Sequence, residues 1–286
     1  MSSNITPLHI MSAFQTEPAP LDFVFPGFLA GSVGALYSPG GVGKSFISLE
    51  ISANVAGIDL LGFGPHSSGR TLYIALEDPV SVLQHRLHAI GHHLAPQQRE
   101  LFAEKVDILP MIYVHFDLLN GRWTDWLTAR AEGVRLIIID TLSRAHSGDE
   151  SSNGEMARLI GILGCVGANT GAAVLFLHHV NKGSGRNSNG DQFAIRGASA
   201  LIDNARFAAS LTSVKTDDID AGYQIKYSIS KHNFAAPIPD LYFSRHKGGV
   251  LLPAPAPVSR QPDDMPKPLS KSNPYLVAKN GGLHDW

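Results

Sequence analysis

A glycine-rich segment between an apolar run and a helical pattern constrains the fold more than any other feature. It reads Ser38-Pro39-Gly40-Gly41-Val42-Gly43-Lys44-Ser45. Apart from Ser38, which stands at the first glycine position, it matches the phosphate-loop pattern G-x-x-x-x-G-K-[ST]. Glycines let several backbone N–H groups face one anion, and the following helix adds the positive end of its dipole. We expect residues 38–45 to bind the phosphates of ATP, with Lys44 at the β- and γ-phosphates and Ser45 on Mg²⁺. The alternative, a chance glycine-rich turn, is disfavoured by this strand-to-helix setting.

Short apolar runs alternate with helical patterns from residue 31 to about residue 204. The runs that read as strands buried on both faces are Val33–Tyr37, Thr71–Leu76, Val134–Asp140 and Ala172–His178. Helical patterns cover Lys44–Ala56, Val80–His92, Pro96–Lys105, Trp123–Ala131 and Gly154–Asn169. This alternation predicts an α/β fold with a mostly parallel central sheet flanked by helices. Three later runs predict antiparallel strands at one edge of the sheet, over Arg206–Ser213, Gln224–Lys231 and Leu241–Ser244.

Composition shifts divide the chain into three parts. In residues 1–30, Pro18, Pro20 and Pro26 interrupt a weakly apolar stretch, and we expect these residues to form an arm that packs on the domain or on a neighbouring copy. Residues 31–252 form the expected ATPase domain. Residues 253–286 are rich in proline, which lacks an amide donor, so they read as a tail.

The overall composition narrows the class of protein. A formal net charge of -2 excludes a globally basic nucleic-acid binder, so any contact with DNA has to be local. The single cysteine, Cys165, excludes an internal disulfide, and we expect it to be an inert core residue. There is no secretory signal and no apolar run of about 18 residues, which predicts a cytoplasmic protein without a membrane span.

Two acidic residues end predicted strands near the phosphate loop. Asp140 closes the run Leu136–Asp140 and could complete the Mg²⁺ shell. Glu77 ends the strand after the first helix, where a carboxylate could polarise the water that attacks the γ-phosphate. Asp78 is the competitor, but the pleat points it elsewhere, and it could cap the helix near Pro79. The alternative for Glu77 is a solvated turn acid.

Two histidines end another buried strand. His178 and His179 point to opposite faces, so at most one of them faces the nucleotide, and we favour His178. A polar side chain there could report the γ-phosphate to the loop that follows. The alternative is a satisfied core or surface histidine.

Taken in this order, the motifs resemble the RecA-like ATPases and, more closely, the RepA-type hexameric replicative DNA helicases of broad-host-range plasmids. The resemblance spans residues 21 to about 250. The segments that carry it are LDFVFPGFLAGSVGALYSPGGVGKS, LYIALEDP, HRLHAIGHHL, LIIIDTLSR, VLFLHHVNKG, IRGASALIDNARF and SKHNFAAP. It implies a RecA-like core, a ring of six subunits with ATP and Mg²⁺ between neighbours, and single-stranded DNA in the channel. It also implies 5′-to-3′ unwinding, with a plasmid replication initiator or a primase as a candidate partner.

The same resemblance assigns roles to individual residues. Glu77 matches the catalytic base, Asp140 the acid of the second motif, and His178 or His179 the γ-phosphate sensor. Arg206 matches an arginine finger supplied to the neighbouring subunit, where a guanidinium stabilises the charge on the γ-phosphoryl group. Rival candidates for this finger are Arg196 and Lys231, and the alternative for Arg206 is an ordinary salt bridge at a strand end.

Two polar loops follow the motif strands, over residues 141–150 and 181–190. In a parallel sheet, ligands gather at the carboxyl ends of the strands, so Arg144, Lys182 and Arg186 could contact DNA phosphates. Neither loop contains an aromatic stacking residue, which favours contact with the DNA backbone over base reading. The alternative is a pair of surface loops.

Other functions are weaker candidates. A RecA-like ATPase could act in recombination, repair or regulation without unwinding DNA. A small-molecule kinase would need an acceptor pocket or lid, and no such insertion is present. His88 and His92 are spaced to share a metal ion, but no third ligand is evident.

Overall fold

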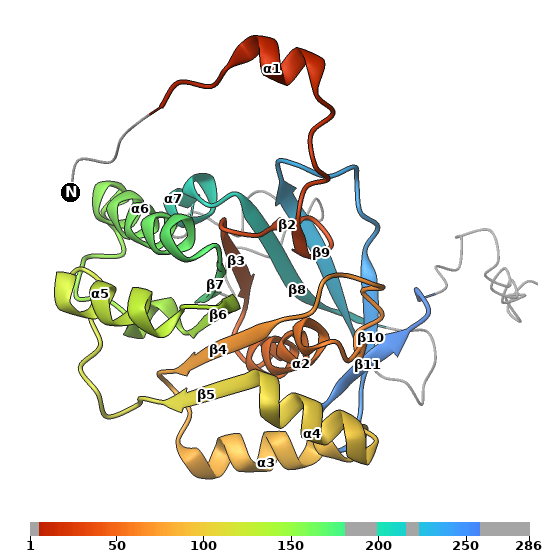
Figure 1. Cartoon of the computed structure of the whole chain (residues 1–286). Helices are drawn as coiled ribbons and strands as arrows, with labels where there is room; N and C mark the ends of the chain where they lie inside the picture. Colours follow the sequence, from red (N-terminus) through yellow and green to blue (C-terminus); the bar gives the residue numbers. More distant parts are fainter. Residues whose placement is uncertain (1–5, 181–198, 216–222, 258–286) are drawn as a thin grey trace, which may run out of the picture.

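A nine-stranded sheet forms the centre of the computed structural model, which describes residues 6–180, 199–215 and 223–257 (Figure 1). The strand order within these residues is β11-β10-β9-β8-β3-β7-β6-β4-β5. Strands β8, β3, β7, β6, β4 and β5 pair in parallel, and β9, β10 and β11 continue the sheet antiparallel. The strand bounds are β3 Val33–Ser38, β4 Arg70–Ala75, β5 Val106–Pro110, β6 Val134–Asp140, β7 Ala173–His179, β8 Phe207–Lys215, β9 Tyr223–His232, β10 Leu241–Arg245 and β11 Leu251–Ala254.

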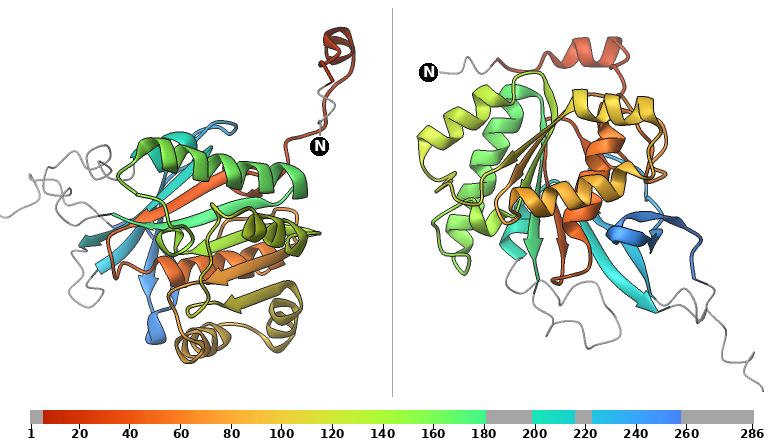
Figure 2. Two further views of the ribbon diagram at one scale, coloured as in Figure 1. Left: turned by 90° about the vertical axis from the view of Figure 1, so that its left-hand side faces the viewer. Right: turned by 90° about the horizontal axis from the view of Figure 1, so that it is seen from below.

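Helices cover both faces of this sheet (Figure 2). Their bounds are α1 Ile10–Gln15, α2 Lys44–Ala56, α3 Val80–Gly91, α4 Pro96–Lys105, α5 Gly121–Arg130, α6 Asn153–Thr170 and α7 Ser199–Asn204, with short 3-10 turns η1 Leu142–Arg144 and η3 Lys247–Gly249. One apolar core joins α2, α3 and α4 to the sheet, and a second joins α5, α6 and α7 to the opposite face. The predicted α/β class, with its antiparallel edge, is confirmed.

Alternate residues along a strand belong to different cores, one on each face of the sheet. On β6, Leu136 and Ile138 belong to the core beside α2, whereas Ile137 and Ile139 belong to the core beside α6. Because side chains alternate along a strand, Asp140 continues the α2 side. The fold therefore directs the side chain that ends this strand toward the helix that follows the phosphate loop.

The amino-terminal boundary differs from the sequence prediction. Phe23–Phe25 (β1) and Phe28–Leu29 (β2) pair as a short antiparallel hairpin, and Phe25 and Phe28 are fully buried in the core beside α2. The arm therefore ends before residue 23 rather than at residue 30. Helix α1 lies in this arm, and none of its residues is buried.

The carboxy-terminal boundary also differs. Strand β11 contains Pro253 and pairs with β10 at the edge of the sheet, so the domain extends beyond residue 252. Proline is tolerated here because an edge strand has one side without a strand neighbour. Residues 258–286 of the expected tail lie outside the described residues.

Helix α6 places Cys165 differently from the expectation. The buried side of α6 carries Met156, Leu159, Leu163 and Val166, and Cys165 falls outside this stripe and is exposed. None of the described helices has both the length and the apolarity of a membrane span.

Candidate nucleotide-binding site

The glycine-rich segment forms the turn between the central strand β3 and helix α2. Gly41 and Gly43 have φ angles of 81° and 123°, which a residue with a side chain rarely adopts. A Cβ at Gly40 or Gly41 would meet no atom within 4 Å, so there is open space beside this turn. No side chain caps the amino-terminal end of α2, which leaves that end available to an anion.

Lys44 lies buried within the turn, with 5% of its surface exposed. Its Nζ donates to the backbone oxygen of Ser38 at 2.9 Å and to the Ser38 hydroxyl at 3.0 Å. Burial lowers the pKa of Lys44 to about 8, against the attraction of Asp140 and Glu77. The Ser38 hydroxyl therefore gives a physical reason for a serine in place of the first glycine, because it holds the ammonium group beside the turn.

Asp140 ends β6 beside α2 and is 2% exposed. Its Oδ2 accepts a hydrogen bond from the Tyr73 hydroxyl at 2.6 Å, and the Ser48 hydroxyl lies 3.0 Å from the same Tyr73 oxygen. Burial raises the pKa of Asp140, against hydrogen bonds from Tyr73 and Ser45. No sequence motif marks Tyr73 or Ser48 as parts of the site.

The residues around Asp140 fit a Mg²⁺ ion. The second carboxylate oxygen, Oδ1, is buried and has no hydrogen-bond partner among the described residues. The Ser45 hydroxyl lies close enough to the same carboxylate to lower its pKa, so two oxygen ligands of the type that Mg²⁺ prefers lie together. A bound cation would give Asp140 Oδ1 the partner that it lacks among the described residues.

Glu77 lies two residues after β4, and the Leu76 N–H bonds the backbone oxygen of Asp140 at 2.7 Å, which keeps the segment beside β6. The Thr141 hydroxyl donates to Glu77 Oε1 at 2.8 Å. The His179 imidazole, and to a lesser extent Thr141, hold the pKa of Glu77 below its usual range, against the effect of burial. Glu77 is therefore ionised at neutral pH and can accept a proton.

Asp78 does not cap helix α3. Its carboxylate forms an ion pair with Arg86 on the second turn of α3, and Pro79 occupies the N-cap position without a side-chain hydrogen bond. Arg86 also lies over the ring of Phe46 at 5.4 Å. Asp78 thus ties α3 to the segment that carries Glu77, and the helix-cap expectation is wrong.

His179 lies between the lysine and the glutamate. Its Nδ1 is 3.0 Å from Lys44 Nζ, and its Nε2 is 3.6 Å from Glu77 Oε2. Because the ammonium can only donate, Nδ1 is the acceptor and the ring proton is on Nε2, toward Glu77. Lys44, Glu77 and His179 therefore form one contiguous group at the carboxyl ends of β3, β4 and β7.

His178 faces the other side of β7. It is buried, burial lowers its pKa to about 4, and its Nδ1 has no hydrogen-bond partner among the described residues. It is therefore neutral at pH 7. These contacts favour His179 over His178 for a role at the phosphate, in contrast to the preference drawn from the sequence.

Arg206 lies far from the phosphate turn of its own chain. Its N–H donates to the backbone oxygen of Val33 at 2.8 Å, at the start of β3, whereas the turn follows the end of that strand. Five residues of strand separate the two places, or about 17 Å. Arg206 also lines a cavity of about 370 Å³ together with Gly161 and Phe234. It cannot reach the nucleotide held by its own subunit.

The rivals for the finger are placed differently. Lys231 donates from Nζ to the backbone oxygens of Ile202 at 3.0 Å and Asp203 at 2.7 Å, so it holds the end of helix α7. Arg196 lies outside the described residues. Among the described candidates, the contacts thus favour Arg206 over Lys231.

The expected DNA-contact residues are only partly described. Arg144 is exposed at the end of the short turn η1, and Glu77 experiences its positive charge. Leu142 and Ala145 in the same loop are buried, so the loop is anchored on the second core. Lys182 and Arg186 lie outside the described residues.

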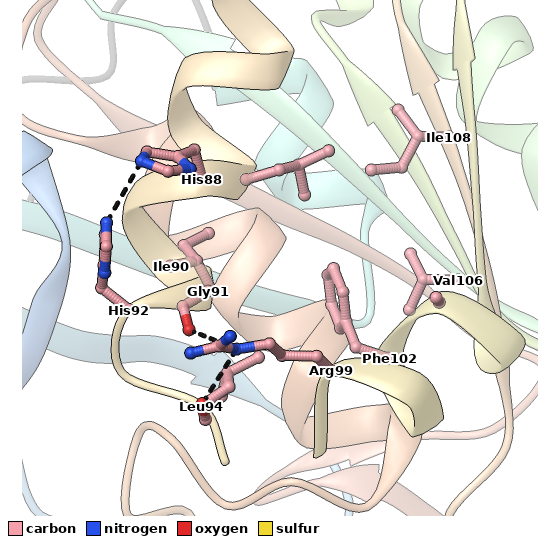
Figure 3. A pocket seen from close by; sticks show the side chains of 11 residues that line it. His88, Ile90, Gly91, His92, Leu94, Arg99, Phe102, Val106 and Ile108 are labelled. Carbon is pink, nitrogen blue, oxygen red and sulfur yellow. Dashed lines mark hydrogen bonds between the residues drawn. The ribbon is translucent and has the colours of Figure 1, made fainter. Parts of the chain in front are cut away.

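An apolar groove of about 560 Å³ lies between α3 and α4 (Figure 3). Its walls include Ile90, Phe102 and Ile108, and its rim carries His88 and His92, whose Nε2 atoms are 3.1 Å apart. Within the described residues, no group of three or more histidine, cysteine, aspartate or glutamate side chains could hold a metal ion. The histidine pair therefore gains no third ligand from the part of the chain that the structure describes.

Comparisons with known proteins agree with this geometry. A family profile described as an AAA domain matches residues 3–185. Among solved structures, the crystal structure of the RadB recombinase superposes with a TM-score of 0.51. The alignment covers 77% of this chain and 90% of the RadB chain, at 12% sequence identity.

Proposed function

Because this chain belongs to the AAA domain family and has a RecA-like P-loop ATPase fold, we propose that it hydrolyses ATP in a ring of identical subunits and translocates on single-stranded DNA. One observation carries the proposal. Lys44, Glu77 and Asp140 converge at the carboxyl ends of the parallel strands, whereas Arg206 lies at the opposite end of β3. Because Arg206 cannot reach the nucleotide of its own subunit, its guanidinium would complete the site of a neighbouring copy.

The phosphate turn would bind the triphosphate through its backbone N–H groups, and Lys44 would exchange its bonds to Ser38 for the β- and γ-phosphate oxygens. The Ser45 hydroxyl and Asp140 would hold Mg²⁺. When bound there, Mg²⁺ neutralises charge on the β- and γ-phosphates. Tyr73 fixes the carboxylate of Asp140, so the ligand oxygen is oriented before the cation arrives.

Glu77 would accept the proton of the attacking water. Its depressed pKa keeps it ionised, and the hydrogen bond from Thr141 holds one oxygen while the other faces the site. His179 would sense the γ-phosphate, because its Nδ1 bonds the same ammonium that the phosphate recruits. A change at Lys44 would thus move His179, the last residue of β7.

Arg206 would act on the nucleotide of the adjacent subunit. A guanidinium there stabilises the charge on the transferred γ-phosphoryl group and is worth about 10³–10⁵ in rate. Since each subunit would supply a turn to one neighbour and an arginine to the other, the contact is head-to-tail, and a closed ring satisfies every site. We propose six subunits, as in the RepA-type helicases that the sequence resembles.

The arm would strengthen this ring. Helix α1 leaves Ile10, Met11 and Phe14 exposed, with Phe14 at 77%. An isolated six-residue helix is unstable in water without a packing partner. Figure 1 and the left view of Figure 2 place α1 and the α3–α4 pair at opposite ends of the molecule, so the apolar groove between α3 and α4 is a candidate acceptor on a neighbouring copy.

Single-stranded DNA would contact the segments that follow β6 and β7 in the sequence, with Arg144, Lys182 and Arg186 on its phosphates. The proposed biological setting is plasmid replication, with an initiator or a primase as loading partner. The second candidate is a RecA-like ATPase that acts on DNA without unwinding it. The RadB recombinase, which shares the fold, favours this candidate.

The test is a forked-duplex unwinding assay with the purified chain, run beside an ATPase assay with and without single-stranded DNA. DNA-stimulated ATPase with strand separation supports the helicase. DNA-stimulated ATPase without strand separation supports the second candidate. A persistent monomer without DNA-stimulated ATPase contradicts both.

A further inference from the structure

The hairpin of β10 and β11 lies along the phosphate turn and helix α2. It touches this segment at three positions, Val42, Phe46 and Glu50. Val42 precedes α2, whereas Phe46 and Glu50 are four residues apart within it and so lie on one face of the helix. The hairpin belongs to the antiparallel edge of the sheet and supplies none of the motif residues.

The first contact holds a peptide of the phosphate turn. Arg245, the last residue of β10, donates from Nη2 to the Val42 backbone oxygen at 2.6 Å. In a trans peptide the oxygen of one residue and the N–H of the next point in opposite directions. Fixing the Val42 oxygen toward Arg245 therefore fixes the Gly43 N–H away from it.

The orientation of the Val42–Gly43 peptide depends on this contact because Gly43 has no side chain. Its φ of 123° lies in a region where glycine moves freely, so the peptide before it has no side chain to hold its orientation. A phosphate turn binds anions through N–H groups that all face one point. A hydrogen bond from a charged donor is among the stronger ones, and it can keep one of these groups oriented before a ligand is present.

The other two contacts hold the hairpin itself. Gly249, with a φ of 97°, lies so close to Phe46 that a Cβ there would come within 2.6 Å of the ring. Glu50, whose side chain is fully buried, accepts at Oε1 from the Leu251 N–H at 2.7 Å. The first contact comes from the last residue of the 3-10 turn η3 and the second from the first residue of β11, and together they keep Arg245 beside the phosphate turn.

We propose that Arg245 is a positioning residue for nucleotide binding, which orients the Val42–Gly43 peptide of the phosphate turn from the β10–β11 hairpin. The proposal rests on the proposed function, since it requires that the turn bind a nucleotide. Arg245 would thus belong to the nucleotide-binding site although it ends β10, a strand that carries none of the sequence motifs. Arg245 would act on affinity rather than on the reacting atoms, because its contact is with the backbone of the turn.

The test is equilibrium binding of Mg-ADP to the full chain, with steady-state ATPase on the same samples. The variants are Arg245→Ala, Arg245→Lys and a control, Asp240→Asn, which removes the surface ion pair between Asp240 and Lys226 at 3.1 Å. Arg245 is exposed, so its truncation is compatible with folding, which circular dichroism checks. A second probe, Gly249→Ala, pushes the turn away from Phe46 and so displaces Arg245 without changing its side chain.

Arg245→Ala is expected to raise the Kd for Mg-ADP about ten-fold, equivalent to about 1.4 kcal/mol. KM for ATP should rise with Kd, while kcat at saturating ATP falls by less than about two-fold. Arg245→Lys should recover most of the affinity, Gly249→Ala should weaken binding, and Asp240→Asn should match the wild type.

A folded Arg245→Ala protein with wild-type Kd overturns the inference and leaves the proposed function intact. A fall in kcat with unchanged KM, or failure of Lys to recover any affinity, overturns it as well. Absence of nucleotide binding in the wild-type chain overturns the proposed function, and the inference fails with it.

Discussion

Glu50→Gln is expected to make the stability of the protein less sensitive to pH. Glu50 is fully buried in α2, and burial raises its pKa to about 8 from its usual value of 4.5, against its hydrogen bond from Leu251 and the charge of Arg245. A carboxyl group with a raised pKa binds its proton more tightly in the folded state than in the unfolded state. The folded state is therefore favoured at low pH and loses this advantage as pH rises from about 4.5 to about 8.

The size of the effect follows from the two pKa values. At about 1.36 kcal/mol per unit of difference, the free energy of unfolding falls by at most about 5 kcal/mol between pH 4 and pH 9, and about 3 kcal/mol of this is lost by pH 7. The amide introduced by Glu50→Gln would resemble the protonated acid and carries no titratable group. Its contribution to the free energy of unfolding is therefore independent of pH over this range.

The assay is urea unfolding of the wild type and of Glu50→Gln at pH 5, 7 and 9. The difference between the two proteins isolates Glu50 from other groups, such as Lys44 and Asp140, that also titrate with folding. The variant should gain relative stability at each step in pH. Glu100→Gln on the exposed surface of α4 is the matched control and should show no such trend. A difference that stays constant from pH 5 to pH 9, or that reverses sign, would refute the reasoning.

Three further predictions concern the site and the ring. Lys44→Ala should abolish ATPase and unwinding together, measured by phosphate release and strand separation. Full ATPase activity in this variant would contradict the assignment of the glycine-rich turn as the nucleotide-binding site. His179→Ala should lower kcat at least ten-fold, whereas His178→Gln should retain most of it because His178 faces the other side of β7. The opposite ranking in steady-state ATPase would instead support His178, the histidine favoured from the sequence. Phe14→Asp should shift sedimentation toward monomers without lowering the unfolding midpoint, because this side chain is exposed in the single chain; unchanged assembly would contradict a role for the arm.

Much of the fold was predictable because the parallel strands are buried on both faces. Runs such as Val134–Asp140 have no polar interruption beyond Arg135 near the start, and the structure gives β6 the same bounds. Strand β5 was missed because it follows α4 without a turn residue and is only half buried, so neither a breaker nor an apolar run marks it. Strand β11 was missed because proline normally excludes a strand, and only its edge position allows Pro253.

Parts of the site needed the structure for different reasons. The choice between the histidines could have been made by alternation, since Leu177 and His179 share the side of β7 that packs toward α2. Asp78 pairs with Arg86 eight residues away, and that pairing depends on the angle of α3, which local sequence does not specify. Arg245 lies 203 residues from Val42, and no motif joins them. Such long-range contacts follow from the order of strands in the sheet.

ATPase of mixed subunits tests most directly whether each site is shared between two chains. Glu77→Ala and Arg206→Ala proteins, each inactive alone, would be mixed in equal amounts under conditions that allow exchange. With head-to-tail contacts, about a quarter of the interfaces regain both an intact glutamate and an intact arginine, so activity should return toward that fraction of the wild-type rate. No recovery in rings shown to be mixed, or full activity of Arg206→Ala alone, would contradict a nucleotide site completed by the neighbouring subunit.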